Sequence, residues 1–426
     1  MSAPGQHHAL TPARERATLA TLCAVQFTHI LDYMIMMPLG PELMLEFRIS
    51  AAQFSQLVAA YSLAAAVSGF AGGFFLDRFD RKRALLALYA GFGLATIACG
   101  LAPTHHWLLV ARLAAGAFGG LAGSLVTAMV ADVIPPERRG RAMSVVMAAF
   151  PIASVVGIYA GLSLADAFGW HAPFFLLGGC AALNLILGAL ALPPIRTAIA
   201  DHEPWRQMRE ILAHRVHRRA FAVGAVLVIA GGCLVPFLAP SFVSNVGLDG
   251  HRDLRWVYAV GGGAAFASTM AIGWLSDRVD RLHLLAWMSA GAVIVTLIIT
   301  RLGPSSLGLA SLMMALFMVT MSSRFAPAMA MVSNAVEARY RGGFMSVNAA
   351  LQQAASGLGN ALAGWFITYD AAGRMLGFPA LGYVAIAFFG LTVLCAYELR
   401  AAAPHVAAPA KKRATPSAPV AENSAA

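Results

Sequence analysis

The stretch that decides the fold is Gly73-Phe74-Phe75-Leu76-Asp77-Arg78-Phe79-Asp80-Arg81-Lys82-Arg83, which lies where one long apolar segment ends and the next begins. Six of its last seven residues are charged. The two flanking segments are hydrophobic enough to stay in a bilayer. A charged cluster between them is solvated at low cost only where it reaches the aqueous phase. A weaker copy, Gly273-Trp274-Leu275-Ser276-Asp277-Arg278-Val279-Asp280-Arg281-Leu282-His283, occurs 200 positions later. We therefore predict two related membrane halves.

The composition supports a membrane protein. Hydrophobic residues make up 59% of the chain before its 40 glycines are counted, whereas soluble domains hold about 45–50% apolar residues with glycine included. The net charge of +10 is typical of the Lys and Arg excess that keeps loops on the cytoplasmic side, so we expect no nucleic-acid partner. The five cysteines show no metal-ligand spacing, and we expect no disulfide, metal or cofactor.

Twelve apolar segments follow one another, each near or above the ~20 residues that a helix needs to cross a bilayer. They cover about 17–44, 53–76, 84–103, 107–133, 142–166, 171–192, 219–246, 254–276, 284–302, 306–333, 343–368 and 377–399. The predicted fold is an all-α membrane protein with twelve transmembrane helices in two six-helix pseudo-repeats. The predicted parts are an N-terminal tail (1–16), a first bundle (17–192), a linker (193–218), a second bundle (219–400) and a disordered tail (401–426).

The distribution of Lys and Arg predicts the orientation. Alternate loops and the two termini hold 23 of these residues, while the other loops hold 5. By the positive-inside rule, both termini are expected in the cytoplasm. In the linker, Trp205, Met208, Ile211 and Leu212 alternate with arginines. This spacing predicts an amphipathic helix on the inner leaflet, and an ordinary solvated linker remains the alternative.

A second pair of segments repeats between the halves. Residues 135–143 follow the fourth apolar segment and residues 337–345 follow the tenth, with their Arg-Gly pairs 202 positions apart. Two six-helix halves in the same orientation are one architecture of secondary transporters, in which the substrate lies between the halves near the membrane midplane.

These motifs resemble the major facilitator superfamily. The resemblance rests on the pattern G-x-x-x-D-R-x-x-R-[KR] and its copy, on Arg112-x-x-x-Gly116, and on Gly157-Ile158-Tyr159-Ala160-Gly161 followed by Gly169-Trp170. It covers about residues 17–400, and within the superfamily the chain is most similar to bacterial proton-coupled drug and sugar efflux proteins, including arabinose-efflux-permease-like ones. The resemblance implies a transporter in the bacterial inner membrane and not an enzyme.

The chain departs from the family pattern at four positions. Asp80 and Asp280 stand where the family usually has glycine, and we expect them to tolerate the left-handed conformation because Asp enters that region more readily than most residues. Ala115 replaces a frequent glutamine, and Tyr159 replaces the proline of many efflux members. The last two departures weaken the transfer of antiport roles to those helices.

For the charged turns, the resemblance implies a cytoplasmic gate. Asp77 and Arg81 would form a latch between the halves together with Asp132 at the end of the fourth apolar segment. A topology anchor without a gating role is the alternative. The candidate gate residues are Gly73, Asp77, Arg78, Arg81, Asp132, Asp277, Arg278 and Arg281.

Asp32 lies in the middle of the first apolar segment, where an ionised carboxylate costs about 2.5–3.5 kcal/mol on insertion scales. We therefore expect it to face a cavity or a partner and to carry a proton. Gln26 and His29 share its helix face at a three-residue spacing. Arg112 and Arg324 are candidate counter-charges, and the resemblance links the fourth-segment arginine, Arg112, to proton movement. A purely structural role for Asp32 is the alternative.

A polar stripe runs along the eleventh segment. Its members recur every four residues and suit either a cavity wall or contacts between helices; both interpretations stay open. Tyr258 is a weaker candidate on the same argument. The predicted substrate-cavity residues are Gln26, Tyr61, Tyr159, Arg324, Asn348, Gln352, Ser356 and Asn360. Gly119-Gly120-Leu121-Ala122-Gly123 and Gly357-Leu358-Gly359 predict close helix contacts rather than phosphate cradles.

The sequence thus predicts a secondary transporter that exports a small organic solute against protons by alternating access, as a functional monomer in the lipid bilayer. Asp32, His29 and Arg112 are the proton-coupling candidates. An importer or uniporter of the same fold is the first alternative, and a membrane enzyme or receptor is the second.

Overall fold

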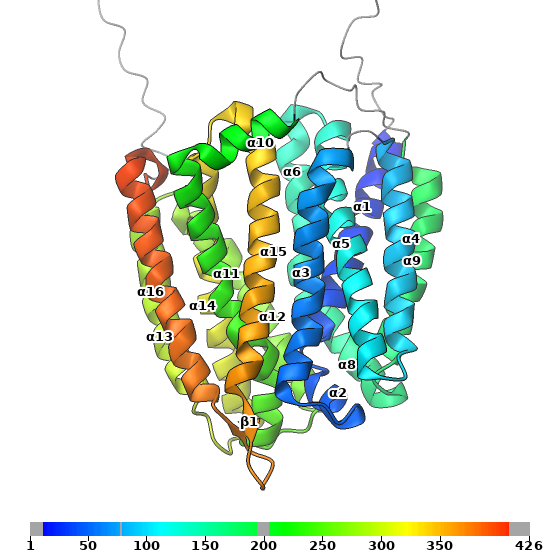
Figure 1. The fold of residues 1–426 in the computed structure, drawn as a ribbon, viewed down its shortest axis with the longest axis vertical. Coiled ribbons are helices and arrows are strands. Elements are labelled where there is room, and N and C mark those ends of the chain that lie inside the picture. Colours follow the sequence, from blue (N-terminus) through cyan, green and yellow to red (C-terminus); the bar gives the residue numbers. More distant parts are fainter. Residues whose placement is uncertain (1–11, 77–78, 194–203, 409–426) are drawn as a thin grey trace, which may run out of the picture.

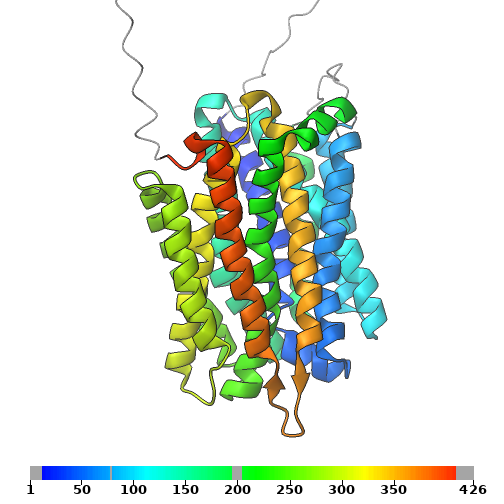
Figure 2. The same ribbon diagram turned by 60° about the vertical axis from the view of Figure 1, so that its left-hand side comes forward.

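The computed structural model describes residues 12–76, 79–193 and 204–408 as a bundle of helices that run side by side (Figures 1 and 2). The first half holds α1 (Pro12–Ile35), α2 (Gly40–Glu46), α3 (Ala51–Phe75), α4 (Arg81–Gly100), α5 (His105–Val133), α6 (Pro136–Met147), α7 (Ala149–Ile152), a π-turn (Ala153–Gly157), α8 (Ile158–Phe168) and α9 (Ala172–Ala191). The linker contains α10 (Pro204–Ala213). The second half holds α11 (Arg215–Ser241), a π-turn (Phe242–Val246), α12 (Leu254–Ser276), α13 (Arg281–Ile299), α14 (Leu307–Asn334), α15 (Arg341–Phe366), β1 (Thr368–Tyr369), β2 (Met375–Leu376) and α16 (Phe378–Ala402).

Ten helical segments of the described chain are long and apolar enough to cross a membrane. The helices α12 and α15, of 23 and 26 residues, have the length but more polar or small side chains. Helix α12 packs against α14, and α15 packs against α3 of the other half. The all-α membrane fold with two six-helix halves is confirmed.

The first predicted span is not one helix. Helix α1 ends at Ile35, and a turn over residues 36–39 leads into α2. Pro38 and Pro41 explain the break, because proline has no N–H to donate and clashes with the preceding helical turn. The fifth span is interrupted in a similar way, since a π-turn follows Pro151 between α7 and α8. Such π-turns are frequent at functional sites.

The bundle has two distinct ends. The charged turns, α10 and both ends of the described chain lie at one end, at the top of Figure 1, which we call the charged end. The strands β1 and β2 form a hairpin at the opposite end, which we call the hairpin end (Figure 2).

Buried apolar side chains show how the halves are joined. One cluster near the hairpin end contains residues of both halves, such as Phe54 of α3 and Phe237 of α11, whose rings meet edge to face at 6.1 Å. Toward the charged end, the clusters of the first and second halves are separate. Among the described residues, the halves therefore share an apolar core only near the hairpin end.

The charged turns begin the helices that follow them. The Asp80 carboxylate accepts a hydrogen bond from the Arg83 N–H at 2.9 Å, and Asp280 accepts from Leu282 and His283 at 3.0 and 3.2 Å. Each aspartate is thus the N-cap of its helix, α4 or α13. Their φ angles are −60° and −62°, so the expected left-handed conformation is wrong. The aspartate side chain stabilises the helix start because it accepts from N–H groups that have no partner within the helix.

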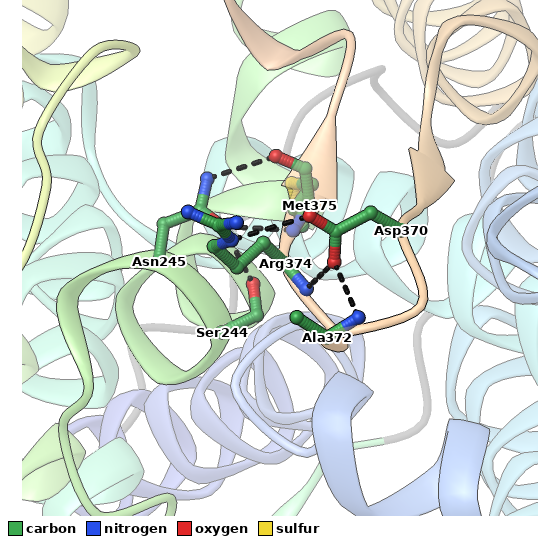
Figure 3. Close-up of polar contacts among 6 residues, drawn as sticks. All are labelled: Ser244, Asn245, Asp370, Ala372, Arg374 and Met375. Carbon is green, nitrogen blue, oxygen red and sulfur yellow. Dashed lines mark hydrogen bonds and ion pairs between the residues drawn. The ribbon is translucent and has the colours of Figure 1, made fainter.

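The hairpin is tied to the bundle by one asparagine (Figure 3). The Asn245 side-chain amide donates to the Met375 carbonyl at 3.0 Å and accepts from the Met375 N–H at 2.8 Å. Across the turn, Oδ1 of Asp370 accepts from the N–H groups of Arg374 and Ala372 at 2.8 and 2.9 Å. These hydrogen bonds, the one from Arg374 first, lower the pKa of Asp370.

Acid is expected to loosen this hairpin. Because the pKa of Asp370 is lower in the folded hairpin, its stabilisation is fully present above the ordinary aspartate pKa of about 3.9. It is lost as the pH falls through the lower folded value. A spin label on Ala371→Cys is expected to become mobile in that acidic window. In the Asp370→Asn control the label is expected to be mobile at every pH, and unchanged mobility of the wild-type hairpin in acid would contradict the assignment.

The linker helix α10 packs on the second half. Ile211 is 1% exposed and belongs to the apolar cluster of that half, with Met208 beside it, while Arg206 and Arg209 are exposed. Met208 and Ile211 of the apolar face expected on the inner leaflet thus pack on the bundle itself, while Leu212 of the same face is exposed. Residues 401–408, expected as part of the tail, complete α16 and form a short 3₁₀ turn whose Val406 is buried. Residues 1–11, 194–203 and 409–426 lie outside the described residues.

Candidate functional site

The first half contains a buried ion pair. The Arg112 guanidinium on α5 donates from Nη1 to Oδ2 of Asp32 on α1 at 2.8 Å, and both side chains are 0% exposed. The same Nη1 donates to the Asp32 carbonyl at 3.3 Å, and the Thr96 hydroxyl on α4 donates to Oδ1 at 3.3 Å. Three helices therefore meet at one carboxylate. Arg112 offsets the cost of its charge inside the membrane.

Tyr61 and His29 complete this group. The Arg112 Cζ lies 4.5 Å from the centre of the Tyr61 ring, a cation–π contact. The Tyr61 hydroxyl lies 2.7 Å from His29 Nδ1. We call His29, Asp32, Tyr61, Thr96 and Arg112 the polar cluster. Nε and Nη2 of Arg112 have no hydrogen-bond partner among the described residues.

Glycines of α5 make room for the polar cluster. A Cβ on Gly116 would lie 2.7 Å from the Tyr61 Cα, and one on Gly119 would lie 2.6 Å from the Tyr61 hydroxyl. A Cβ on Gly120 would lie 2.8 Å from the Ala65 Cα. The predicted close helix contact of this glycine run is confirmed. The run at Gly357 and Gly359 is likewise packed against Leu63 and against the Ile229 carbonyl.

The structure distinguishes the two candidate counter-charges. Arg112 pairs with Asp32 and does not extend to the membrane surface. Arg324 lies inside the second half, where it donates to Ser289 Oγ at 3.2 Å and Thr392 Oγ1 at 3.4 Å and lies 4.3 Å from the Phe389 ring centre. Its described partners come from α13, α14 and α16, and none of them contacts Asp32.

The three polar residues predicted on one face of α1, Gln26, His29 and Asp32, do not share one environment. His29 and Asp32 belong to the polar cluster, whereas Gln26 is partly exposed and its Oε1 has no hydrogen-bond partner among the described residues. A Cβ on Gly123 of α5 would lie 3.3 Å from His29 Nε2 and 3.8 Å from Gln26 Oε1. Gln26 and His29 therefore border the same small-residue stripe of α5.

The polar stripe of α15 divides into two parts. Toward the charged end, Gln352 donates to the Met329 sulfur at 3.2 Å and Asn348 lies against Gly224, both within the second half. Toward the hairpin end, Ser356 and Asn360 reach the first half: Ser356 Oγ lies 3.3 Å from the Tyr33 hydroxyl, and Asn360 Nδ2 donates to that hydroxyl at 3.5 Å. Only the second part of the stripe forms contacts between the halves.

The halves are sealed against each other near the hairpin end. Tyr159 of α8 meets Trp256 of α12 edge to face at 5.2 Å. Arg255 pairs with Asp166 at 3.8 Å, and His251 pairs with Glu42 at 3.7 Å. We call these three contacts, together with the packing of α15 on α3, the seal. Tyr159 is thus part of the seal, and Tyr258, 5% exposed, lies beside it on α12 without a described partner for its hydroxyl.

Replacing Asp166 by asparagine is expected to weaken the seal. The pair is partly exposed, with side chains 23% and 46% accessible, and such pairs contribute about 0–1 kcal/mol. Labelling of a cysteine placed inside the seal, from the hairpin end, is expected to rise up to about fivefold, and the rise should vanish at high salt because exposed charges are screened. Glu337→Gln, whose carboxylate pairs with Arg339 within the second half at the charged end, is the matched control. Equal labelling in both variants would contradict the assignment.

The gate candidates at the charged end form contacts within each half. Arg81 Nε pairs with Asp132 Oδ2 at 2.9 Å, which ties α4 to α5. Arg281 donates from Nη1 to the carbonyls of Val406 and Ala408 at 3.2 and 2.8 Å, so it holds the C-terminal segment. Arg278 stacks on Trp274 at 3.4 Å.

For the other four gate candidates, the described part of the chain shows no contact between the halves. Asp277 is exposed at the end of α12, and Gly73 lies in the last turn of α3. Asp77 and Arg78 lie outside the described residues. In this conformation Arg81 pairs with Asp132 between two helices of the first half. The latch between the halves stays a prediction, because its third member, Asp77, lies outside the described residues.

Sequence reasoning missed three residues of the site. Thr96 binds the Asp32 carboxylate, Tyr33 bridges to α15, and the Ser55 hydroxyl donates to the Asn360 carbonyl. Single hydroxyl groups in apolar helices gave no pattern to detect. The position of Tyr33 directly after Asp32 was the one available signal.

Two surface hollows lie away from the polar cluster. One of about 750 Å³ at the charged end is lined by α10, the start of α11, the α14–α15 connection and residues 402–405. Another of about 520 Å³ is lined by the α4–α5 connection, the end of α8 and the start of α9. Within the described ranges, no group of three or more His, Cys, Asp or Glu is placed to hold a metal ion.

Comparisons with known proteins agree with this architecture. The chain is similar to a bacterial homologue of the human lysosomal transporter Spinster in an inward-facing, occupied conformation, with a TM-score of 0.77, 17% identity and coverage of 94% of this chain and 99% of that one. It is 31% identical to the uncharacterized MFS-type transporter YceJ of Bacillus subtilis over 173 residues, 41% of this chain and 44% of that protein. It is 25% identical to the gallate transporter of Pseudomonas putida, over 62% of this chain and 67% of that protein. The match to YceJ thus spans less than half of that relative.

A family model extends the match along the chain. The model described as Major Facilitator Superfamily matches residues 22–323, which include the polar cluster, both charged turns and the linker. The match covers well over half of the 426 residues. The chain belongs to the Major Facilitator Superfamily and is a multi-pass membrane protein.

Proposed function

We propose that the protein exports a small organic solute in exchange for protons, by alternating access of a site between its halves. The observation that carries the proposal is the Asp32–Arg112 pair, sealed inside the first half at 2.8 Å and one residue from a contact between the halves at Tyr33. A carboxylate in that position takes up a proton only when water reaches it, which ties protonation to opening of the seal.

The mechanism follows from the arrangement of charges. In the proposed inward-facing state the charged end faces the cytoplasm and the seal is closed. Opening the seal admits water to Asp32, whose carboxylate takes a proton, and Arg112 loses its partner and keeps its contacts with Tyr61 and the Asp32 carbonyl. Return to the inward-facing state restores the ion pair and delivers the proton to the cytoplasm. One proton per cycle would then drive the solute outward.

The solute is proposed to lie between α1, α5 and α15. Gln26 on the first half and Asn348 on the second each leave an amide oxygen without a described partner. Export agrees with the similarity to multidrug resistance protein 3 of Bacillus subtilis, which is 28% identical over 43% of this chain. The charged end is proposed as cytoplasmic because Lys and Arg gather there.

Uptake of a small organic acid is the second candidate. Two longer matches favour it: the gallate transporter and the probable 4-methylmuconolactone transporter of Cupriavidus pinatubonensis cover 62% and 60% of this chain. Both candidates use the same proton site and differ in the direction of solute movement relative to the proton.

A transport assay with imposed pH gradients tests both candidates. The chain is reconstituted into proteoliposomes of known orientation, and a panel of drugs, sugars and aromatic acids is offered on each side. Proton-coupled export predicts solute movement opposite to the proton, and uptake predicts movement with it. Solute movement that ignores the pH gradient would contradict both and would favour a uniporter.

A further inference from the structure

Tyr33 joins the α1 segment that carries the proposed proton site to α15 of the second half. It follows Asp32 in α1, and its hydroxyl lies 3.3 Å from Ser356 Oγ and 3.5 Å from Asn360 Nδ2 on α15 of the other half. The hydrogen-bond partners of Tyr33 therefore belong to the second half. Its backbone is joined directly to Asp32, which pairs with Arg112. A displacement of α1 at Asp32 moves both.

The ring of Tyr33 contacts the polar cluster as well. Its centre lies 5.4 Å from that of Tyr61 with an angle of 35° between the planes. Tyr61 in turn lies under the Arg112 guanidinium at 4.5 Å and next to His29 Nδ1 at 2.7 Å. Loss of the Asp32 charge leaves Tyr61 as a main neighbour of the Arg112 cation, so the tilt of Tyr61 against Tyr33 depends on that charge.

The α15 partners of Tyr33 lie in a closely packed part of the seal. Asn360, which donates to Tyr33, accepts at its carbonyl from the Ser55 hydroxyl of α3. The Gly364 N–H donates to the same hydroxyl at 3.2 Å. A Cβ on Gly364 would lie 2.7 Å from the Ala52 Cα, and one on Gly357 would lie 3.1 Å from the Leu63 nitrogen. Helix α15 thus packs closely against α3 at the Tyr33 contact and one turn beyond it, toward the hairpin end.

We propose that Tyr33 is the positioning residue through which the proton state of Asp32 controls the seal. With Asp32 charged, Arg112 is held on α1, the Tyr61 ring supports Tyr33, and the Tyr33 hydroxyl holds α15 against α3. When the seal opens transiently, a proton from the hairpin-end solution reaches an Asp32 oxygen and removes the ion pair. The Tyr61 ring then shifts with Arg112, Tyr33 no longer rebinds Ser356 and Asn360, and the seal stays open. This inference rests on the proposed function, because it assumes that Asp32 is the proton site.

The groups that face Asp32 decide what else titrates with it. Arg112 from α5 pairs with the carboxylate directly. Tyr61 from α3, Cys99 and Tyr89 from α4, and His29 from α1 interact electrostatically with Asp32 or with Arg112, and within the described chain none of these four donates a hydrogen bond to the carboxylate. Among these, only Asp32 and Arg112 form an ion pair within the described chain. Removal of the Tyr33 hydroxyl therefore leaves every titratable neighbour of Asp32 in place.

The test compares two tyrosine variants that differ only in position. Tyr33→Phe removes the hydroxyl that reaches α15. Tyr89→Phe removes a buried hydroxyl of the same half that contacts Thr28 and Asn184 and has no described contact with α15. Spin labels on Phe168→Cys and Gly303→Cys, exposed positions at the hairpin end of the two halves, report opening of the seal in lipid nanodiscs as the pH is lowered. The five native cysteines are replaced by alanine.

The expected result separates the two tyrosines. In Tyr33→Phe the pH-dependent change in the ratio of open to sealed protein is expected to fall about three- to tenfold, the range of one or two net hydrogen bonds. Tyr89→Phe should keep the wild-type response. In transport, Tyr33→Phe is expected to flatten the pH profile of kcat with KM changed less than about twofold, because Gln26 and Asn348, whose amides are the proposed solute contacts, are left in place.

Other outcomes overturn one idea or the other. A wild-type response in Tyr33→Phe, or an equal loss in Tyr89→Phe, overturns the role of Tyr33. A wild-type response in Asp32→Asn overturns the proposed function itself, whatever Tyr33→Phe does. A lost response in Asp32→Asn beside a retained one in Tyr33→Phe leaves the proposed function standing and removes only this inference.

Discussion

Replacing Asp32 by asparagine is expected to abolish uphill transport and to leave solute exchange intact. Asparagine keeps the shape and one acceptor oxygen but carries no proton through the cycle, so the pH gradient no longer drives the solute. Accumulation in proteoliposomes should fall to passive equilibration, while exchange of labelled for unlabelled solute continues. The physical reason is the sealed position of Asp32, whose charge is matched by Arg112 at 2.8 Å.

Stability must be separated from coupling in this experiment. Breaking a buried ion pair by removal of one partner costs about 3–5 kcal/mol, because the other charge is left uncompensated. The double variant Asp32→Asn with Arg112→Gln removes both charges and is expected to recover most of that loss while coupling stays absent. Thermal unfolding in detergent measures the first effect and the pH dependence of transport measures the second. Uphill transport that survives in a folded Asp32→Asn protein would contradict the proton role.

Replacing Gly116 by alanine is expected to destabilise the first half strongly. The new Cβ would meet the carbonyl and the Cα of Tyr61, the latter at 2.7 Å, and backbone atoms of a packed helix have no alternative rotamer. Overpacking of this kind typically costs about 1–3 kcal/mol. The displaced Tyr61 would also move the cation–π contact with Arg112, so transport should fall together with the melting temperature.

The control for Gly116→Ala is an alanine at an open glycine. A Cβ on Gly179 of α9 would meet nothing within 4 Å, and alanine is favoured over glycine in a helix by about 0.8–1.0 kcal/mol. Gly179→Ala is therefore expected to leave the melting temperature unchanged or raise it. If both substitutions lowered stability equally, helix packing at Gly116 would not be the cause.

The sequence predicted the fold better than the contacts of the site. Hydrophobic run lengths and the two charged turns were enough for the two-bundle membrane fold, because a bilayer admits few other solutions. The break after Ile35 was missed because the residues on both sides of Pro38 are apolar. The N-cap role of Asp80 and Asp280 was also missed, since a family pattern with glycine at those positions suggested a turn conformation.

For the site, the sequence singled out Asp32 because a lone acid in an apolar span is costly wherever it lies. It left both Arg112 and Arg324 as candidate counter-charges, and only the family resemblance added weight to Arg112. The structure separates them through helix packing: α5 lies against α1 and brings Arg112 to Asp32, while Arg324 contacts α13 and α16. Contacts such as Tyr33 with Ser356 join residues 323 positions apart, and no local pattern encodes that distance.

By itself the sequence determined that this chain lies in a membrane and that its two halves are related. It also showed that Asp32 lies inside an apolar span, where a carboxylate is costly unless it has a partner or a functional role. Those conclusions depend on the free energy of moving each side chain out of water, which is a property of the residue and its near neighbours. Only the tertiary structure decided which cation meets that acid, that the halves are closed near the hairpin end, and that Tyr33 touches both sites. Those facts depend on how separate helices pack, and packing is settled by the shapes of surfaces that meet only after the chain has folded.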